Sequence, residues 1–254
     1  MFRLQSGGLI NREKVLNFSF NGKKLYGYEG DTLASALLAN GKHLVGRSFK
    51  YHRPRGIFSA GSEEPSALIQ LGLGAHTEPN IRATTVPLFN NLVVTSQNHL
   101  GPLEWDLMRI NDFLSPFLGA GFYYKTFMWP KSFWEKIYEP IIRQAAGLGK
   151  LSSKEDPSSY DKGFLHCDLL IIGSGPSGLQ SALTAARSGA KVILVDEDFL
   201  LGGSLNGEKL QINDVSASDW GAQIIEELKS FENVRLLHKT TVYGAFDHGI
   251  FGAL

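Results

Sequence analysis

The sequence predicts a mixed α/β chain, with an α+β domain followed by a separate α/β domain. Near the N-terminus, two segments of alternating apolar residues flank Asn21-Gly22, which is a strong signal for a β-hairpin. Farther along, the apolar run Leu169–Ile172 leads into a glycine-rich turn and an alanine-rich helix, as in a parallel β-α-β unit. A chain of 254 residues that is 43% hydrophobic can bury a core and divide into two domains.

The first domain, residues 1–100, is expected to be a β-grasp domain. Val15–Phe20 and Lys24–Tyr28 form its hairpin, Asp31-Thr32 supplies the N-cap of a helix, and Asn40-Gly41 ends that helix. A hairpin followed by a helix that packs on it opens the fold shared by ubiquitin and plant-type ferredoxins. We therefore expect a ferredoxin-like domain, and one without a cluster because it contains no cysteine.

Basic side chains gather around Pro54, and two interpretations of them remain open. They form either a solvated basic loop, or a contact to an anion, a cofactor phosphate or another subunit through guanidinium groups. Charge reversal at Arg53 and Arg55 distinguishes the two, since unchanged assembly and cofactor content would leave the solvated loop. The residues are Arg47, Lys50, His52, Arg53 and Arg55.

Residues 101–160 are expected to connect the two domains. As far as Tyr138 this segment is rich in aromatic side chains, whose area is costly to leave in water. They form either a core between the domains, which we prefer, or a surface that another subunit buries. Leu151–Tyr160 is polar and broken by proline, which is typical of a linker. The aromatic residues are Trp105, Phe113, Phe117, Phe122, Tyr123, Tyr124, Phe127, Trp129, Phe133 and Trp134.

The second domain, residues 161–254, is expected to be a Rossmann-type FAD/NAD(P)-binding domain. Its glycines have the spacing G-x-G-x-x-G: Gly173 allows the tight turn, Gly175 lets a pyrophosphate approach, and Gly178 lets the helix pack closely. The helix Ser177–Ser188 would hold the phosphates with its free N–H groups and its positive dipole end. The predicted pyrophosphate turn consists of Gly173, Ser174, Gly175, Pro176, Ser177 and Gly178.

An acidic residue is expected to hold the ribose. Lys191–Val195 has the pattern of a second buried strand, and Asp196 follows it, about 20 residues beyond the first glycine. Because its charge would repel a 2′-phosphate, NAD or FAD is expected rather than NADP. A glycine-rich turn in another kind of β-α-β unit is the alternative, which the agreement of strand, turn, helix and acid disfavours.

Later segments complete the predicted domain. Gly202-Gly203-Ser204 is a second glycine turn, which either closes over the dinucleotide or is an ordinary connection. Thr241–Tyr243 begins another strand, on which Val242 would contact the adenine. Between them lie a helix capped by Ser218 or Asp219 and a third parallel strand at Val234–Leu237.

The end of the chain, Asp247–Leu254, reads as a turn and half a hairpin with no closing element. A dinucleotide fold needs further strands to finish its sheet. We therefore expect the domain to be truncated, and the sequence to be a fragment of a longer polypeptide or to depend on one.

Composition excludes several classes of function. The formal net charge is zero, with 25 acidic and 25 basic residues, so nucleic acid is not an expected partner. Cys167 is the only cysteine, which excludes an internal disulfide and a thiolate-bound iron–sulfur or zinc site, and suits a reducing cytoplasm. The histidines have no metal-ligand spacing, and no apolar run suits a signal peptide or a membrane span.

The order and combination of these motifs resemble the N-terminal part of the alpha subunit of heterotetrameric sarcosine oxidase, over nearly the whole chain. Related amine and cyanide-forming dehydrogenases share this layout, but some carry a ferredoxin cluster. The loop Gly56–Pro65 has no cysteine, which favours the oxidase. The resemblance rests on Phe20–Lys23, Tyr28–Gly41, Arg47–Gly61, Glu64-Pro65, Gly173–Gly178, Val195–Glu197 and Leu201–Ser204.

The resemblance implies an enzyme that oxidises sarcosine with oxygen to glycine, hydrogen peroxide and a one-carbon unit for tetrahydrofolate. It also implies non-covalent NAD on this subunit, FAD on a beta subunit, covalent FMN at the alpha–beta interface, and gamma and delta subunits. No catalytic residue is implied in this chain, and Asp198 departs from the basic residue usual at its position. The implied NAD contacts are Gly173, Gly175, Pro176, Ser177, Gly178, Asp196, Glu197, Asp198, Gly203, Ser204 and Val242.

Other classes of protein remain as alternatives. A free-standing FAD- or NAD-dependent oxidoreductase needs a second glycine-acid motif or a nicotinamide half with a base, and the sequence has neither. A disulfide oxidoreductase is excluded because Ser204-Leu205 stands where a cysteine pair is needed. A subunit of a related amine dehydrogenase, or a non-catalytic scaffold subunit with a structural dinucleotide site, stays open. Loss of NAD binding in Asp196→Ala would indicate a working site.

Overall fold

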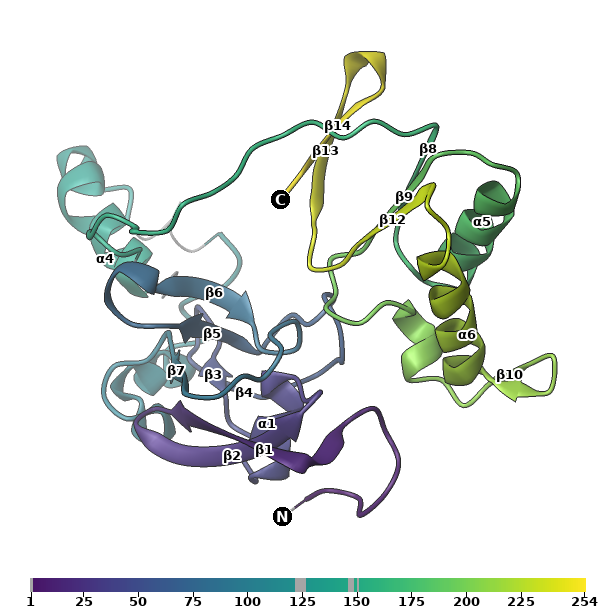
Figure 1. Ribbon diagram of the computed structural model, residues 1–254. Coiled ribbons are helices and arrows are strands. Elements are labelled where there is room, and N and C mark those ends of the chain that lie inside the picture. The colour runs from purple at the N-terminus through teal and green to yellow at the C-terminus, as the bar shows by residue number, and fades with distance from the viewer. Residues whose placement is uncertain (1, 122–126, 146–148, 150) are drawn as a thin grey trace. The chain divides into compact units, whose positions relative to one another are not determined.

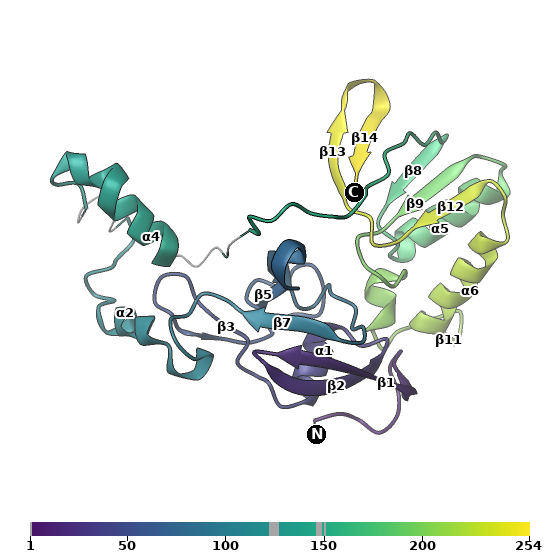
Figure 2. The same ribbon diagram turned by 60° about the vertical axis from the view of Figure 1, so that its left-hand side comes forward.

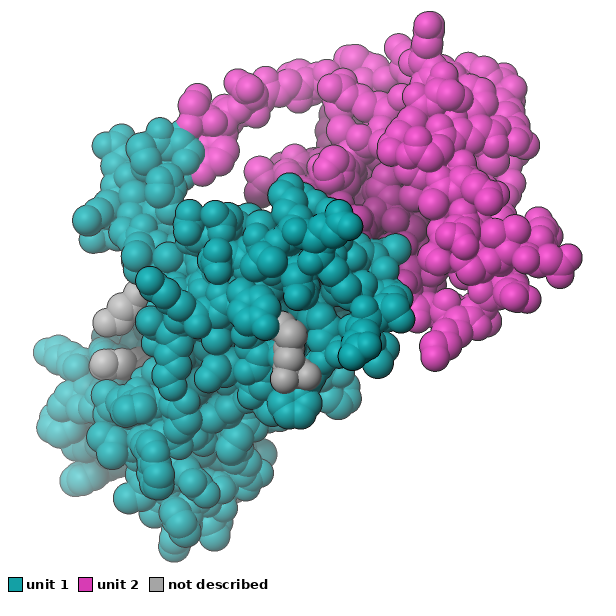
Figure 3. Space-filling model, turned by 60° about the horizontal axis from the view of Figure 1, so that its bottom comes forward, with its two compact units in different colours: residues 1–158 teal, residues 159–254 magenta. Residues whose placement is uncertain are grey.

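The structure is a computed structural model that describes residues 2–121, 127–145, 149 and 151–254. The chain divides into two compact units, residues 1–158 and residues 159–254, coloured separately in Figure 3. Each unit has a hydrophobic core of its own, as expected for separate domains.

Unit 1 is built around a five-stranded mixed sheet with the order β2-β1-β7-β5-β6 (Figure 1). The hairpin of β1 and β2 turns at Asn21 and Gly22, whose φ angles of 49° and 75° are those of a tight hairpin turn. β7 pairs in parallel with β1, and β5 and β6 continue the sheet in antiparallel pairing. The strands are β1 Asn11–Phe20, β2 Lys23–Glu29, β5 Leu68–Leu71, β6 Glu78–Arg82 and β7 Leu92–Ser96.

The helix α1, Leu33–Ala39, packs on this sheet. The hydroxyl of Thr32 caps it by accepting a hydrogen bond from the Ser35 N–H at 3.0 Å. Leu33 and Leu37 are fully buried and join the strand side chains in one core. The predicted β-grasp arrangement of hairpin and helix is confirmed.

The remainder of unit 1 consists of short elements, and several of its described aromatic side chains are exposed. Trp105, Phe113, Phe117 and Trp129 are 78% to 84% exposed, so these four side chains do not belong to the core of unit 1. The predicted aromatic residues Phe122, Tyr123 and Tyr124 lie outside the described residues. The short elements are β3 Gly46–Arg47, β4 Pro54–Arg55, η1 Gly74–His76, η2 Leu103–Trp105, η3 Leu107–Arg109, α2 Ile110–Phe113, η4 Lys131–Phe133, η5 Trp134–Tyr138 and α4 Glu139–Ala145.

Unit 2 contains a parallel three-stranded sheet with the order β12-β9-β8, and Figure 2 shows α5 and α6 together beside it. Leu179 of α5 and Leu228 of α6 pack with Val192 and Leu194 of the central strand in a buried core. The alternation of strand and helix confirms the predicted Rossmann-type domain. The elements are β8 Leu169–Ile172, α5 Pro176–Arg187, β9 Val192–Val195, η6 Gly203–Asn206, β10 Gln211–Ile212, β11 Val215–Ser216, α6 Ala217–Lys229 and β12 Val234–Leu237.

The cap of α6 differs from the prediction. Ser216, rather than Ser218 or Asp219, is the N-cap residue, and its hydroxyl accepts a hydrogen bond from the Asp219 N–H at 3.2 Å. Several neighbouring polar residues could serve as the N-cap. Because the helix begins at Ala217, the residue directly before it, Ser216, takes this position.

The end of the chain also differs from the prediction. The expected strand at Thr241–Tyr243 is present as β13, Val242–Phe246, but it pairs with β14, Ile250–Ala253, in a hairpin of their own (Figure 2). The expectation of half a hairpin without a closing element is therefore wrong, because η7, Asp247–Gly249, turns the chain back into β14. Within the described residues, no helix combines the length and the apolar character needed to cross a bilayer.

Candidate functional site

The turn between β8 and α5 has a geometry that requires glycine at two positions. Gly173 has a φ of 99°, a conformation that L side chains rarely adopt. A Cβ atom on Gly178 would lie 2.0 Å from the carbonyl oxygen of Gly173, so no side chain fits where α5 packs against the turn. The turn is therefore tight, and the helix begins directly beside it.

The N-terminus of α5 is left without a side-chain cap. Its N-cap residue is Gly175, whereas Thr32 and Ser216 cap α1 and α6 with their hydroxyls. A Cβ atom on Gly175 would meet nothing within 4 Å, so there is open space in front of the helix. The first N–H groups of a helix have no partner within it and lie at its positive dipole end. This combination suits the binding of a phosphate group.

The predicted ribose acid, Asp196, is engaged by the glycine turn itself. Its carboxylate accepts hydrogen bonds from the N–H and the hydroxyl of Ser174, at 2.6 and 2.5 Å, and from the N–H of Asp198, at 2.8 Å. Ser174 is fully buried, and its hydroxyl oxygen accepts a hydrogen bond from the Gly202 N–H at 2.9 Å. Both carboxylate oxygens of Asp196 are thus engaged by protein groups: Oδ2 by Ser174 and Oδ1 by the Asp198 N–H.

The second glycine turn packs directly on the first. Gly202 and Gly203 have φ angles of 121° and 54°, and a Cβ atom on Gly203 would lie 3.1 Å from the Cα atom of Gly175. The structure therefore brings Gly203 next to the pyrophosphate turn, with Ser204 at an exposed position after it. Gly202 was predicted to belong to the second glycine turn but was not among the predicted NAD contacts, and its N–H donates to the Ser174 hydroxyl. The doubled glycine after the acid is the signal that marks it.

Three further predicted site residues lie outside the two glycine turns in the sequence: Glu197, Asp198 and Val242. Glu197 follows Asp196, and its side chain is exposed. Asp198 is fixed through its backbone, since its carbonyl oxygen accepts a hydrogen bond from the Lys239 N–H at 2.9 Å. Val242 begins β13 and shares no sheet with β8 or β9.

Two family models match the chain, one in each unit. Residues 13–99 match a "2Fe-2S iron-sulfur cluster binding domain", and residues 168–241 match an "FAD dependent oxidoreductase". The chain therefore consists of a ferredoxin-like domain followed by an FAD-dependent oxidoreductase region, in the predicted order.

Similarity over the whole chain identifies its relatives. Sarcosine oxidase subunit alpha of Rhizobium meliloti (strain 1021) is 55% identical over 253 residues, which cover 100% of this chain and 26% of that protein. Sarcosine oxidase subunit alpha of Corynebacterium sp. (strain U-96) is 36% identical over 95% of this chain and 20% of that protein. The chain is a homologue of sarcosine oxidase subunit alpha. It spans only 20% to 26% of the length of these two relatives.

A solved structure supports the fold of this alpha-subunit homologue. L-proline dehydrogenase from P. horikoshii has a TM-score of 0.55 over 94% of this chain and 36% of that chain, at 20% sequence identity. At this identity the similarity concerns the fold alone.

In this alpha-subunit homologue, the basic segment 47–55 has a role that neither sequence interpretation described. The guanidinium group of Arg47 is buried and donates to the carbonyl oxygen of Leu103, at 2.7 and 3.0 Å, and to that of Glu104, at 3.0 Å. It also donates to the carbonyl oxygen of His52 at 3.1 Å. Arg47 therefore clamps the start of the connector onto the ferredoxin-like domain.

Other basic residues of the segment extend this clamp. The Nζ atom of Lys50 donates to the carbonyl oxygen of Gly119 at 2.9 Å, and the Nε atom of Arg53 pairs with the carboxylate of Asp112 at 2.7 Å. Arg55 is exposed. Arg47, Lys50 and Arg53 therefore all bind other groups of unit 1, and the basic segment is not simply a solvated loop.

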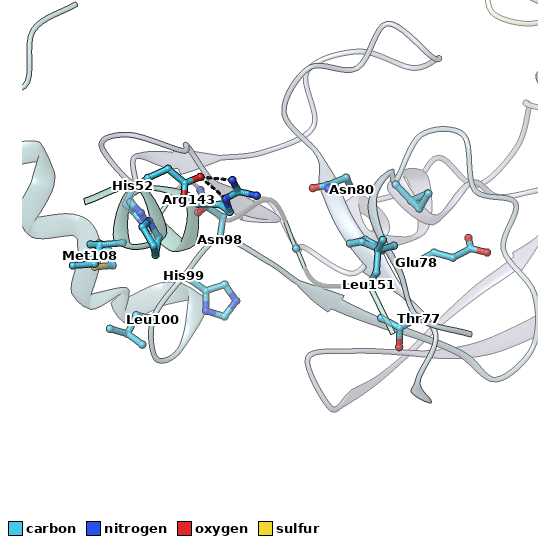
Figure 4. Close-up of a pocket in the computed structure, with 16 residues that line it drawn as sticks. His52, Thr77, Glu78, Asn80, Asn98, His99, Leu100, Met108, Arg143 and Leu151 are labelled. Carbon is cyan, nitrogen blue, oxygen red and sulfur yellow. Dashed lines mark hydrogen bonds and ion pairs between the residues drawn. The ribbon is translucent and has the colours of Figure 1, made fainter. Parts of the chain in front are cut away.

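A large hollow of about 1320 Å³ lies in unit 1, apart from the glycine turn. Figure 4 shows His52, Asn98, His99 and Arg143 among its lining side chains. None of the predicted dinucleotide contacts lines it. Throughout the described part of the chain, no three or more His, Cys, Asp or Glu side chains come together as a metal site.

Proposed function

We propose that this chain is the part of a sarcosine oxidase alpha subunit that binds NAD non-covalently. In the complete complex, with beta, gamma and delta subunits, sarcosine would be oxidised by oxygen to glycine and hydrogen peroxide, and a one-carbon unit would pass to tetrahydrofolate. FAD on the beta subunit and FMN at the alpha–beta interface would supply the amine oxidation, so we assign no catalytic residue here. A reducing cytoplasm is the proposed setting, in keeping with the single cysteine, Cys167.

The observation that carries this proposal is the 55% identity to the R. meliloti alpha subunit across the whole chain. The uncapped N-terminus of α5 supports the choice of ligand. Unit 2 offers backbone N–H groups, a positive dipole end and open space at one point, which together suit a diphosphate.

We assign the residues of unit 2 as follows. The N–H groups of Ser177 and Gly178 would donate to the diphosphate, and Gly175 would allow its approach. Glu197 would accept the ribose hydroxyls, because its carboxylate is exposed while that of Asp196 is engaged by Ser174. Asp196 is in this assignment a positioning residue, which holds the shape of the turn.

The proposal is tested by isothermal titration of the full chain with NAD. Gly175 has a φ of −63°, and a Cβ atom there meets nothing, so Gly175→Ala should fold normally while its methyl group obstructs the diphosphate. We expect its affinity for NAD to fall by about tenfold or more. The matched control is Gly207→Ala, at a φ of −116° with the same free space, which should bind as the unmodified chain does. Unchanged binding in Gly175→Ala, or no binding by the folded chain, contradicts the proposal.

FAD is a second candidate for the same site. The observation that favours it is the match of residues 168–241 to a family of FAD-dependent oxidoreductases. Titration with FAD alongside NAD, and the visible absorbance of any nucleotide released from the purified chain, distinguish the two. A flavin released from this chain would replace NAD in the proposal and leave the role of the glycine turn unchanged.

A further inference from the structure

A buried carboxylate lies inside a loop of the ferredoxin-like domain. Glu64 is 1% exposed, and each of its carboxylate oxygens accepts two backbone N–H groups. Oε2 accepts from Phe58 and Ser59 at 2.7 and 2.6 Å, and Oε1 accepts from Ser66 and Ala67 at 2.7 and 3.0 Å. We refer to these four N–H groups as the amide cradle. Such a cradle needs an acceptor at its centre, since buried N–H groups are costly to leave unpaired.

The position of Glu64 in the loop matches that of a metal ligand. Plant-type ferredoxins hold a [2Fe–2S] cluster with cysteines at the spacing C-x4-C-x2-C and a further cysteine elsewhere. The residues at this spacing in the loop are Ser59, Glu64 and Ala67, which offer a hydroxyl, a carboxylate and a methyl group. The region that matches the cluster-binding family, residues 13–99, contains no cysteine. These residues do not fit a cluster held by thiolates.

The carboxylate occupies the centre of the three ligand positions. It is carried by the middle position, Glu64, and it accepts the N–H groups of the first and third positions, Ser59 and Ala67. A cluster bound through these positions would have to lie among the same backbone groups. The carboxylate and a cluster are therefore alternatives for one place in the fold.

We propose that Glu64 replaces the iron–sulfur cluster as an internal anion. Cluster sulfurs accept hydrogen bonds, and a carboxylate offers the same N–H groups a negatively charged acceptor. The ferredoxin-like domain thereby keeps the loop of an electron carrier without an electron-carrying centre. Its role is then structural, consistent with the connector that Arg47 clamps onto it.

The surroundings of Glu64 support an ionised side chain. Burial raises the pKa of its carboxyl group, but the hydrogen bonds of the amide cradle outweigh burial and leave the pKa below its ordinary value. The charged side chains nearby are Arg82, whose Nε atom donates to the Glu64 carbonyl oxygen at 3.2 Å, and the exposed Glu63. Thr84, also buried, holds the loop by donating to the Gly61 carbonyl oxygen at 2.7 Å.

Hydrogen exchange of the cradle amides in the full chain tests this proposal directly. In Glu64→Gln, one carboxylate oxygen becomes an NH2 group that faces two N–H donors. The exchange of that pair should become faster by about tenfold or more. The control Glu63→Gln changes the exposed neighbouring glutamate and should leave all four rates unchanged. Equal protection of the cradle in Glu64→Gln and the unmodified chain overturns the proposal.

Two measurements on the unmodified chain do not depend on the folding of a variant. After anaerobic incubation with iron and sulfide, the chain should contain no stoichiometric iron and show no visible absorbance of a [2Fe–2S] cluster. In an NMR titration of the carboxyl carbons, the pKa of Glu64 should lie below that of an ordinary glutamate. A reconstituted cluster, or a Glu64 that titrates as an ordinary glutamate, overturns the proposal.

Discussion

The carboxylate of Asp196, at the end of β9, accepts hydrogen bonds from both the N–H and the hydroxyl of Ser174, which follows β8. The same hydroxyl accepts the N–H of Gly202, so one buried serine joins the acid to both glycine turns. Asp196 therefore fixes the shape of the turn, while the carboxylate of Glu197 beside it stays exposed. The proposed function gives Asp196 a structural role and Glu197 the contact to the ribose, and these two adjacent acids can be changed one at a time.

Asp196→Asn should destabilise unit 2. The amide keeps the size of the side chain but replaces one acceptor oxygen with a donor, so an N–H or hydroxyl of its present partners loses its acceptor. We expect the free energy of unfolding to fall by about 1–3 kcal/mol. Hydrogen exchange of the β8 and β9 amides measures this loss within unit 2, and unchanged protection of these strands would show that the link to Ser174 is not stabilising.

Glu197→Gln should weaken the binding of NAD and leave the stability of unit 2 nearly unchanged. We expect the stability of unit 2 to change by less than about 0.5 kcal/mol, because the side chain is exposed. The affinity for NAD should fall by about tenfold, because charge-assisted hydrogen bonds to the ribose are replaced by weaker ones. Titration calorimetry measures this affinity. If the variant binds NAD as tightly as the unmodified chain, Glu197 does not hold the ribose, and Asp196 or another group does.

Gly178→Ala should prevent α5 from packing on the turn. The added methyl carbon would lie 2.0 Å from the Gly173 carbonyl oxygen, which belongs to the backbone and cannot rotate away. We expect a loss of about 3 kcal/mol or more in stability, measured as the midpoint of denaturant unfolding. Gly175→Ala is the comparison, since its methyl group enters open space and should leave the midpoint unchanged. Equal midpoints for the two variants contradict the described packing of α5.

Local sequence patterns predict the elements whose form depends on nearby residues. Asn21-Gly22 favours its turn wherever it occurs, and the glycine spacing after β8 constrains the turn and the start of α5 together. For this reason the hairpin, α5 and the parallel strands around it follow from the sequence alone. The order and combination of the motifs also predict the resemblance to sarcosine oxidase subunit alpha, which the 55% identity over the whole chain confirms.

Contacts between distant residues are what the sequence does not predict. Arg47 bonds to the carbonyl oxygen of Leu103, 56 positions away, and a basic cluster gives no sign of which carbonyl groups it will meet. The Glu64 side chain reads as an ordinary acid until the folded loop turns four N–H groups toward it. Trp105 and Phe113 are exposed, although aromatic residues are usually buried. The presence of aromatic residues in a sequence therefore does not predict which surface covers them.

Arg47→Lys should loosen the connector. Lysine keeps the charge but lacks the planar fork that reaches the carbonyl oxygens of Leu103 and Glu104 together. We expect a loss of about 1–3 kcal/mol in the stability of unit 1 and faster limited proteolysis between residues 103 and 119. Arg55→Lys, at an exposed position, is the control and should be digested at the original rate. Digestion of Arg47→Lys at that same rate contradicts the clamp.

Charge reversal separates this clamp from an anion site. Arg53→Glu breaks an exposed pair with Asp112, which should cost less than about 1 kcal/mol. Arg55→Glu should change neither stability nor bound nucleotide. Loss of a bound anion or of subunit assembly in Arg55→Glu would instead support the phosphate or subunit contact that the sequence left open.

Glu64 should make the stability of unit 1 depend on pH in the acidic range. Because the pKa of the folded carboxyl group lies below the ordinary glutamate value of 4.5, folding favours the ionised side chain. This contribution is fully present above about pH 4.5 and is lost as the pH falls through the folded pKa. The unmodified chain should therefore be more stable than Glu64→Gln at neutral pH, by about 1–3 kcal/mol.

The difference between the two chains should shrink as the pH is lowered, and urea unfolding of unit 1 at a series of pH values measures it. Glu29 provides the control, because a hydrogen bond from Lys14 also lowers the pKa of its carboxyl group, although both side chains are exposed. Solvent and salt screen such a pair, so Glu29→Gln should differ little from the unmodified chain, and less still at high salt. A stability difference for Glu64→Gln that stays constant from neutral pH to below 4.5 would mean that the amide cradle does not hold an ionised carboxylate.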